Sequence, residues 1–298
     1  MRSVPRTGGI VAPVPGAVAR GRSLRRVRAG IRRAPVYVAL VAGAVVMLVP
    51  FLWMVSTSLQ PDSALRGDPQ LVPANPTFDN YSRIAEAFPF WRFLANSLVV
   101  AGVSTVLQVF TSAMGAYAFA RLVFRGRDAL FIVYLATLMV PLQVTIVPLF
   151  IEMRFLGLVN TYPGLILPAV ASAFGTFLLR QAFLGLPRDL DEAAFIDGAG
   201  HWTVFRRVLL PLAGPALATF TVFAFMASWN SFLWPLIVTS APDLMTLPVG
   251  LSALQGRYET AWNVVMAGAT VSVIPILVIY ALAQRHVVRG VAFSGIKG

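Results

Sequence analysis

The chain has 298 residues and contains no cysteine, two histidines and a single lysine. Without cysteine it can form neither a disulfide nor a thiolate metal site, and it has no thiol nucleophile. The lysine, Lys297, is followed only by Gly298, so we expect no helix after it. A P-loop needs a lysine between a glycine-rich turn and a helix. We therefore expect that this chain does not bind ATP through a P-loop.

Charged residues are also scarce, at 12% of the chain, whereas hydrophobic residues make up 57% and the mean hydropathy is +0.75. A soluble domain carries about 25% charged residues. Six apolar stretches have about the length of 20 residues that a membrane-spanning helix needs, and none contains Asp, Glu, Lys, Arg or His. We therefore predict an all-α integral membrane protein with six transmembrane helices. The predicted spans are Val36–Thr57, Leu94–Ala120, Ala129–Ile151, Pro163–Leu179, Val208–Trp234 and Val264–Ala283.

The basic residues are distributed unevenly around these spans. Of the 24 arginines and lysines, 19 lie before span one or after spans two, four and six. Segments rich in Lys and Arg stay in the cytoplasm. The asymmetry predicts a multi-pass protein of the plasma (inner) membrane, with both the N-terminus and the C-terminus inside.

Residues 1–35 contain nine arginines and no acidic residue, together with several prolines and glycines. Such a composition disfavours a compact fold, so we predict a disordered, Arg-rich cytoplasmic tail. The tail would set the topology and contact anionic membrane lipid. We expect no nucleic-acid binding, because no aromatic residues are interleaved with the arginines.

Two outside loops are long. The first, residues 58–93, is rich in proline but contains a candidate short amphipathic helix at Tyr81–Ala87. The second follows span five and runs from Ser240 to Trp262. It is long enough to reach a soluble partner or to cap a pore.

The inside loop between spans four and five carries the strongest helical signal outside the membrane. Asp189 is a candidate N-cap, and Glu192 three residues later would complete a capping box. Gly198 and Gly200 are expected to end this helix, and His201 is expected on the loop surface. Small side chains would let a partner approach closely, and acidic residues would form a charged rim. The small residues are Ala193, Ala194 and Gly198, and the acidic ones are Asp189, Asp191, Glu192 and Asp197.

This loop resembles the EAA loop of ABC importer permeases, whose pattern is EAA-x3-G-x9-I-x-L-P. Glu192, Gly198 and Pro211 keep the spacing, and Val208 replaces the isoleucine. The alternative is an ordinary amphipathic connector. Most of residues 36–298 is similar to the sugar-importer branch of these permeases, the maltose-type second permease subunit. The similar stretches are Asn96–Leu98, Gly115–Arg121, Ser228–Phe232 and Phe293–Gly298.

The resemblance implies that residues 36–298 form the transmembrane domain of a type I ABC importer. The chain would not itself be an enzyme, because ATP and Mg²⁺ would be bound by an ATPase dimer. Its other partners would be a second homologous permease and an extracytoplasmic solute-binding protein. Residues 189–199 would form a coupling helix docked on one ATPase subunit. The implied ATPase-coupling residues are Asp189, Glu192, Ala193, Ala194, Asp197, Gly198 and Pro211.

Uncharged polar side chains within the spans could line a path for a neutral, hydroxylated solute or could join helices to each other. The candidates for the substrate path are Gln108, Gln143, Asn230 and Ser231. The resemblance favours a sugar or related polyol, with a non-sugar solute as the alternative. A secondary transporter is disfavoured because the spans lack ionisable residues. An intramembrane enzyme is disfavoured because cysteine and an H-E-x-x-H pair are absent.

Overall fold

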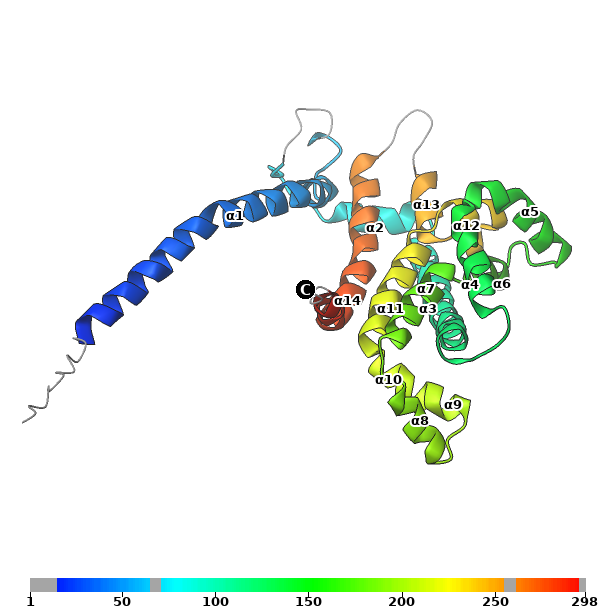
Figure 1. Cartoon of the computed structure of the whole chain (residues 1–298). Coiled ribbons are helices and arrows are strands. Elements are labelled where there is room, and N and C mark those ends of the chain that lie inside the picture. Colours follow the sequence, from blue (N-terminus) through cyan, green and yellow to red (C-terminus); the bar gives the residue numbers. More distant parts are fainter. Residues whose placement is uncertain (1–14, 65–70, 255–260, 295–298) are drawn as a thin grey trace, which may run out of the picture. The chain divides into compact units, whose positions relative to one another are not determined.

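The computed structural model describes residues 15–64, 71–254 and 261–294, and these form helices, turns and loops without any strand (Figure 1). The all-helical prediction is confirmed for that part of the chain. The chain divides into two units, Met1–Met54 and Val55–Gly298. The α-helices are α1 (Pro15–Ser58), α2 (Asp79–Ala87), α3 (Phe90–Arg121), α4 (Arg127–Ala136), α5 (Leu142–Phe155), α6 (Tyr162–Ile166), α7 (Ala173–Leu184), α8 (Asp189–Ile196), α9 (His201–Thr203), α10 (Leu210–Leu212), α11 (Gly214–Trp229), α12 (Leu233–Val238), α13 (Leu247–Ala253) and α14 (Trp262–Ser294).

The described part of the first unit is residues 15–54, which belong to α1. Residues 15–35 belong to this helix, whereas the sequence predicts disorder there. Arg, Ala and Leu favour a helix, and extending an existing helix costs far less than nucleating one. The remaining residues of the predicted tail, 1–14, lie outside the described residues. The stretch Pro35–Ser58 buries none of its most apolar window within the chain, as expected for a surface that faces lipid.

Three described helices are long and apolar enough to cross a membrane, namely Pro35–Ser58, Phe90–Arg121 and Trp262–Arg285. Three bent helix pairs would raise the number to six if each pair is one span. The bends are 99° between Arg127–Met139 and Leu142–Phe155, 46° between Tyr162–Ala169 and Ala173–Leu184, and 82° between His201–Leu212 and Gly214–Trp229. Predicted spans three, four and five therefore correspond to bent helix pairs and not to single straight helices.

Proline explains where these helices break. Pro141 precedes α5 and holds Val140 in an extended conformation, with φ −89° and ψ 110°. Pro168 lies in the 3₁₀ turn Leu167–Ala169 that ends the α6 segment. Pro211 and Pro215 flank the bend between α10 and α11. Each proline removes a backbone donor, so the helix before it cannot continue unchanged.

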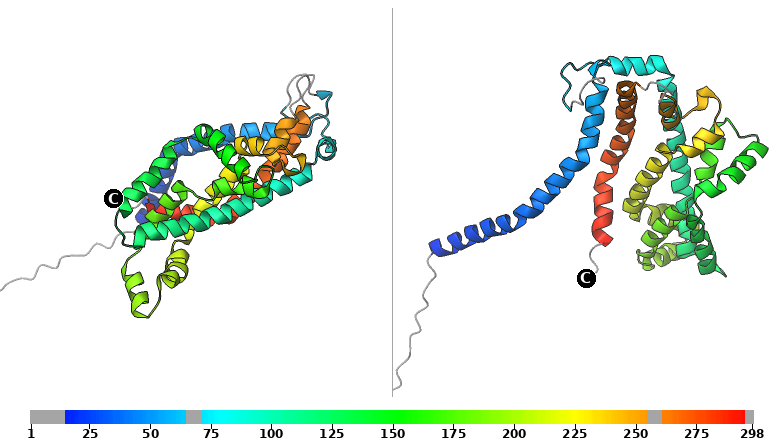
Figure 2. Two further views of the ribbon diagram at one scale, coloured as in Figure 1. Left: turned by 90° about the vertical axis from the view of Figure 1, so that its right-hand side faces the viewer. Right: turned by 90° about the horizontal axis from the view of Figure 1, so that it is seen from above.

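Helix α3 is the centre of the second unit, and α7 and α11 both pack along it (Figure 2). The contact is close because α3 presents small buried residues such as Ala113, Ala116 and Ala120. A large apolar cluster around Leu179 and Phe183 covers the C-terminal end of α3. A second cluster, around Phe90 and Trp229, joins the other end of α3 to α11 and α14.

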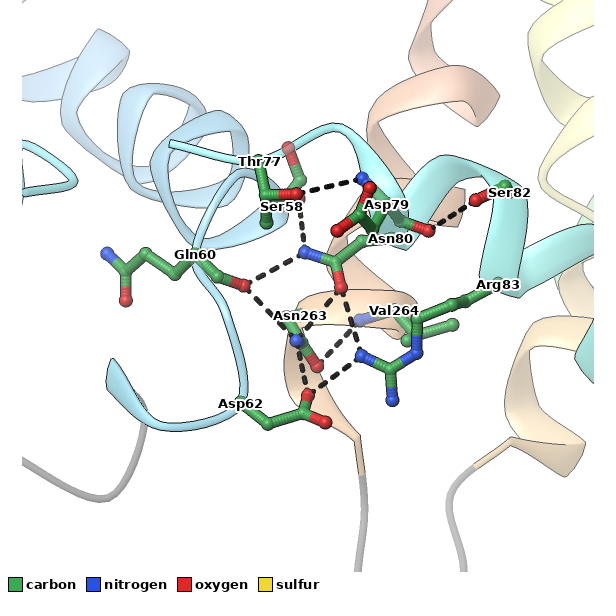
Figure 3. Close-up of polar contacts among 10 residues, drawn as sticks. All are labelled: Ser58, Gln60, Asp62, Thr77, Asp79, Asn80, Ser82, Arg83, Asn263 and Val264. Atoms are coloured by element: carbon green, nitrogen blue, oxygen red, sulfur yellow. Dashed lines mark hydrogen bonds and ion pairs between the residues drawn. The ribbon is translucent and has the colours of Figure 1, made fainter. Parts of the chain in front are cut away.

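The predicted amphipathic helix at Tyr81–Ala87 is confirmed as α2, which begins at Asp79. Its buried Asn80 donates to the carbonyl oxygens of Ser58 and Gln60, at 2.9 Å each (Figure 3). The buried Asn263 at the start of α14 donates to Asp62 Oδ1 at 2.6 Å and to Asn80 Oδ1 at 3.0 Å. This network of buried amides joins α2 to the chain after α1 and to the first turn of α14.

Asn160 joins the loop before α6 to the loop after α12. Its φ is +57°, which favours Asn or Gly. Its backbone N–H donates to Val238 O at 3.0 Å, and its side-chain oxygen accepts from the N–H groups of Ser240 and Ala241. The side chain therefore acts as a cap for a loop about 80 residues away in the sequence.

We predict that Asn160→Gly lowers stability by about 0.5–1.5 kcal/mol, because it keeps the backbone conformation but removes the oxygen that accepts from the N–H groups of Ser240 and Ala241. Asn160→Asp keeps an acceptor and is the matched control, with a stability close to that of the unsubstituted protein. The measurement is the midpoint of thermal unfolding in detergent. Equal midpoints for the Gly and Asp variants would show that the side-chain bonds are unimportant.

Candidate functional site

The EAA loop, here residues 189–212, contains α8, α9, the π-helical turn Val204–Leu209 and α10. Two views show that α8 and α9 project away from the rest of the second unit (Figures 1 and 2). Helix α8 begins at Asp189, and its acidic residues lie in the first turn. Carboxylates are favourable there because they face the positive end of the helix dipole.

The predicted capping box is wrong. The N-cap is Arg188, which is itself helical with φ −71° and ψ −25°, and no side chain caps the helix. The carbonyl of Arg188 accepts from the N–H groups of Asp191 and Glu192 at 2.9 and 3.1 Å. Asp189 is therefore one residue too late in the helix to act as its cap, and Glu192 is left exposed to solvent.

Gly198 ends α8, as predicted. Its φ is +82°, in the left-handed region. The N–H of Gly198 donates to Phe195 O at 3.0 Å, and the N–H of Ala199 donates to Ala194 O at 2.9 Å. This pair of bonds is a Schellman motif, which requires a residue that tolerates positive φ. Gly200 has a different role, because it is extended, with φ −84° and ψ 168°, and precedes α9.

The acidic residues of α8 do not form a single rim. Asp189, Glu192 and Asp197 are exposed, but Asp191 is only 7% exposed. Its Oδ2 lies 2.9 Å from Nε of Arg121, at the end of α3. The prediction that Asp191 belongs to the rim is therefore wrong, because this carboxylate faces inward to a buried guanidinium.

The exposed surface of the EAA loop is apolar as well as acidic. Ala193 is exposed, whereas Ala194 is half-buried against the cluster around Leu179. Larger apolar side chains of the loop are also exposed, and Ile196 is 86% exposed. Outside a membrane, exposed apolar surface of this kind is typical of a protein contact. The exposed large apolar residues of the loop are Leu190, Phe195, Ile196, Trp202 and Leu212.

His201 is exposed, as predicted, but it also has specific contacts. Its Nδ1 lies 2.9 Å from the hydroxyl of Tyr117 on α3, and its ring meets that of Phe195 edge-on at 5.0 Å. Sequence analysis missed both Tyr117 and Arg121 as residues of this site. Their positions lie at least 65 residues before the loop, and nothing in their local pattern indicates a contact with it.

Pro211 lies in α10, immediately before the 82° bend that leads into α11. The preceding turn, Val204–Leu209, is π-helical. π-helical turns have wider, less favourable geometry and are frequent at functional sites. The connection from α8 to α11 therefore contains a π-helical turn and a sharp bend.

A cavity of about 230 Å³ lies between α3, α5, α6, α11 and α12. Of the four substrate-path candidates, it brings together Gln108 and Ser231, while Gln143 and Asn230 are outside its lining. Gln108 donates to Ala169 O at 2.6 Å, and Asn230 donates to Met226 O on its own helix at 2.9 Å. The polar residues and the indole that line the cavity are Ser97, Gln108, Ser228, Ser231, Trp234 and Thr246.

Thr246 is notable among the lining residues because it is 4% exposed and its hydroxyl has no hydrogen-bond partner in the described part of the chain. A buried hydroxyl usually has such a partner. The walls are otherwise mostly apolar. Within the described residues, no group of three or more His, Asp or Glu side chains could hold a metal ion.

The sequence of this chain matches a family of transport proteins and several of its members. Residues 109–293, which include the whole EAA loop, match the family described as "binding-protein-dependent transport system inner membrane component". The arabinooligosaccharides transport system permease protein AraQ of Halalkalibacterium halodurans is 37% identical over 259 residues, which are 86% of this chain and 93% of AraQ. The trehalose transport system permease protein SugB of Mycobacterium tuberculosis is 38% identical over 255 residues, with 84% and 93% covered.

A solved structure has a similar fold. A chain of a bacterial ABC transporter involved in the import of the acidic polysaccharide alginate has a TM-score of 0.77 and 26% sequence identity, covering 87% of this chain and 96% of that chain. The expected resemblance to ABC importer permeases is thereby confirmed. By sequence match and by relatives of more than 30% identity along most of its length, this chain belongs to the family of binding-protein-dependent transport system inner membrane components.

Proposed function

We propose that this chain is a membrane-spanning subunit of a binding-protein-dependent ABC importer and that it moves a sugar or related polyol across the plasma membrane. The observation that carries the proposal is the exposed EAA loop on a chain of this family. ATP hydrolysis belongs to separate ATPase subunits. The chain itself supplies the path for the solute and the surface that receives the motion of the ATPase.

The proposed orientation follows from charge. With six spans, counting each bent pair as one, the N-terminus, the C-terminus and the EAA loop lie in the cytoplasm, where 19 of the 24 basic residues collect. The loops between α12 and α14 then face outward, toward a solute-binding protein. Residues 255–260 of that region are outside the described residues. A second homologous permease completes the path, and an ATPase dimer holds ATP and Mg²⁺.

The proposed docking surface is the exposed side of α8 and its C-terminal turn. Ala193 and Gly198 allow close approach, and Ile196 supplies apolar area for burial in a groove. Glu192 and Asp197 would meet polar or basic groups at the edge of that groove. Asp189 lies at the start of α8 and Pro211 at the exit of the loop, and Ala194 packs the helix against the apolar cluster around Leu179 and Phe183.

The proposed solute contacts are Gln108 and Ser231, which the cavity brings together, with the unpaired hydroxyl of Thr246 beside them. A sugar offers many hydroxyl groups for such partners, and its apolar ring faces suit the aromatic and aliphatic walls. The names of AraQ and SugB, which refer to arabinooligosaccharides and trehalose, support a carbohydrate.

The test is purification of the tagged chain from its native membrane in a mild detergent, with partners identified by mass. We expect a second permease and an ATPase. The purified complex in liposomes, given the matching binding protein, should take up a labelled sugar only when ATP is present. Recovery of the chain alone, from a preparation in which other membrane complexes stay intact, would contradict the proposal. Uptake driven by a proton gradient without ATP would indicate a secondary transporter instead.

A further inference from the structure

Helix α3 contacts every functional part of the second unit. It has 32 residues without a break, which corresponds to a length of roughly 48 Å at 1.5 Å per residue. The bent pairs Arg127–Phe155, Tyr162–Leu184 and His201–Trp229 all break within their length. A continuous helix transmits a displacement from end to end, whereas a bend can absorb it.

One end of α3 is joined to the EAA loop. The ion pair between Arg121 and Asp191 is closely buried, with side-chain exposures of 5% and 10%. Arg121 also donates from Nη2 to Leu186 O at 3.1 Å, in the segment that leads into α8. One turn earlier, the hydroxyl of Tyr117 meets His201 just beyond the Schellman turn. These contacts join Asp191 of α8, the segment before α8 and the residue that begins α9 to the end of α3.

The other end of α3 is joined to the loop between α12 and α13. Asn96 donates from Nδ2 to Asp243 O at 2.8 Å and to Met245 O at 2.9 Å. Ser97 accepts from the N–H of Leu247 at 2.7 Å. Ser97 also lines the cavity, together with Gln108 about three turns further along the same helix.

The covalent route from α8 to α11 is less regular than α3. It passes through a π-helical turn and an 82° bend before it reaches α11. A displacement of α8 therefore reaches α3 through direct buried contacts, but reaches α11 through an irregular connection. A buried ion pair is suited to this purpose, because separating its charges leaves each one without compensation.

We propose that α3 is the rigid element that carries the movement of the docked EAA loop to the cavity and to the loop at 239–246, and that the Arg121–Asp191 ion pair is the joint between loop and helix. The inference rests on the proposed function as an ABC importer. It makes Arg121 and Asp191 positioning residues, which touch neither the solute nor the ATPase. Their role is to make the loop and α3 move as one body.

The experiment compares variants of the complete complex in liposomes, with ATP hydrolysis and sugar uptake measured on the same preparation. Asp191→Asn keeps the size of the side chain and removes its charge, and it leaves the exposed face of α8 unchanged. We expect ATP hydrolysis to persist while sugar taken up per ATP falls about tenfold, a typical factor for coupling between two sites. Asp128→Asn is the matched control, because it removes ion pairs with Arg127 and Arg180 in which the carboxylate is 70% exposed. It should leave uptake per ATP unchanged.

Unchanged uptake per ATP in Asp191→Asn would overturn the inference. If that variant does not assemble, Arg121→Met combined with Asp191→Leu replaces the ion pair by apolar packing. Low uptake per ATP in an assembled double variant would support the ion pair as a joint, and normal uptake per ATP would overturn it. Failure of the proposed function itself has a different signature, because the unsubstituted complex would then show no ATP-driven uptake.

Discussion

Replacement of Gly198 by valine is expected to separate ATP hydrolysis from sugar uptake, with a fall in uptake per ATP of about tenfold, as for the loss of a coupling between sites. The reason is the backbone, since φ at this position is +82° and nothing lies within 4 Å of the place where a Cβ would be. The left-handed conformation disfavours a side chain by about 1–2 kcal/mol, and more for a β-branched one. Valine therefore opens the Schellman turn and releases the end of α8.

Gly200→Ala is the matched control for this substitution. Gly200 is two residues away and also has open space around it, but its φ of −84° suits any residue. The alanine variant should transport normally. Uptake and hydrolysis are measured together on the complex in liposomes. Normal uptake per ATP by Gly198→Val would mean that the shape of this turn does not matter for coupling.

The second large effect is expected at Gly175, where α7 crosses α11. A Cβ at this position would overlap the ring of Phe220, which is 1% exposed and so has no free space to move into. Overpacking of this kind destabilises a protein by about 1–3 kcal/mol. We predict that Gly175→Ala lowers the midpoint of thermal unfolding in detergent and the yield of membrane-inserted protein.

Two further variants show whether the ring is responsible. Gly102→Ala adds the same methyl group in α3, where nothing lies within 4 Å, and should be neutral or slightly stabilising, since alanine favours a helix by about 1 kcal/mol over glycine. Phe220→Leu removes the ring, so the double variant with Gly175→Ala should be more stable than the sum of the single effects predicts. Additive effects would show that Gly175 is needed for another reason.

The Arg121–Asp191 pair shows why part of the site escaped prediction. In the sequence, Asp191 is one of several acidic residues in a helical turn, and helical spacing alone does not say which of them faces inward. Arg121 is a basic residue that follows a span, and as such it predicts only the orientation of that span. That the two side chains meet depends on how α7 packs along α3 and brings the start of α8 to its end. Tertiary packing alone sets that geometry.

The same distinction applies to the substrate-path candidates. Gln108, Gln143, Asn230 and Ser231 are equivalent as uncharged polar residues in apolar segments. The breaks at Pro141 and at Ala213–Gly214 rotate the helix segments relative to each other. As a result, two of the candidates line the cavity and two do not. Thr246, which the sequence places in an ordinary loop, lies beside them because that loop is bonded to Asn96 and Ser97.

The sequence by itself determined the membrane class, the helical content, the position of the EAA loop and the glycine that ends its helix. These features depend on composition and on local residue preferences, such as the tolerance of glycine for positive φ. Only the tertiary structure decided where the spans bend, which acidic residue of α8 is buried and which polar residues share a cavity. Those features depend on contacts between segments that are 40 to 150 residues apart, as in the bonds of Trp229 to Ser272 and of Ser97 to Leu247. Local residue preferences carry no information about such contacts.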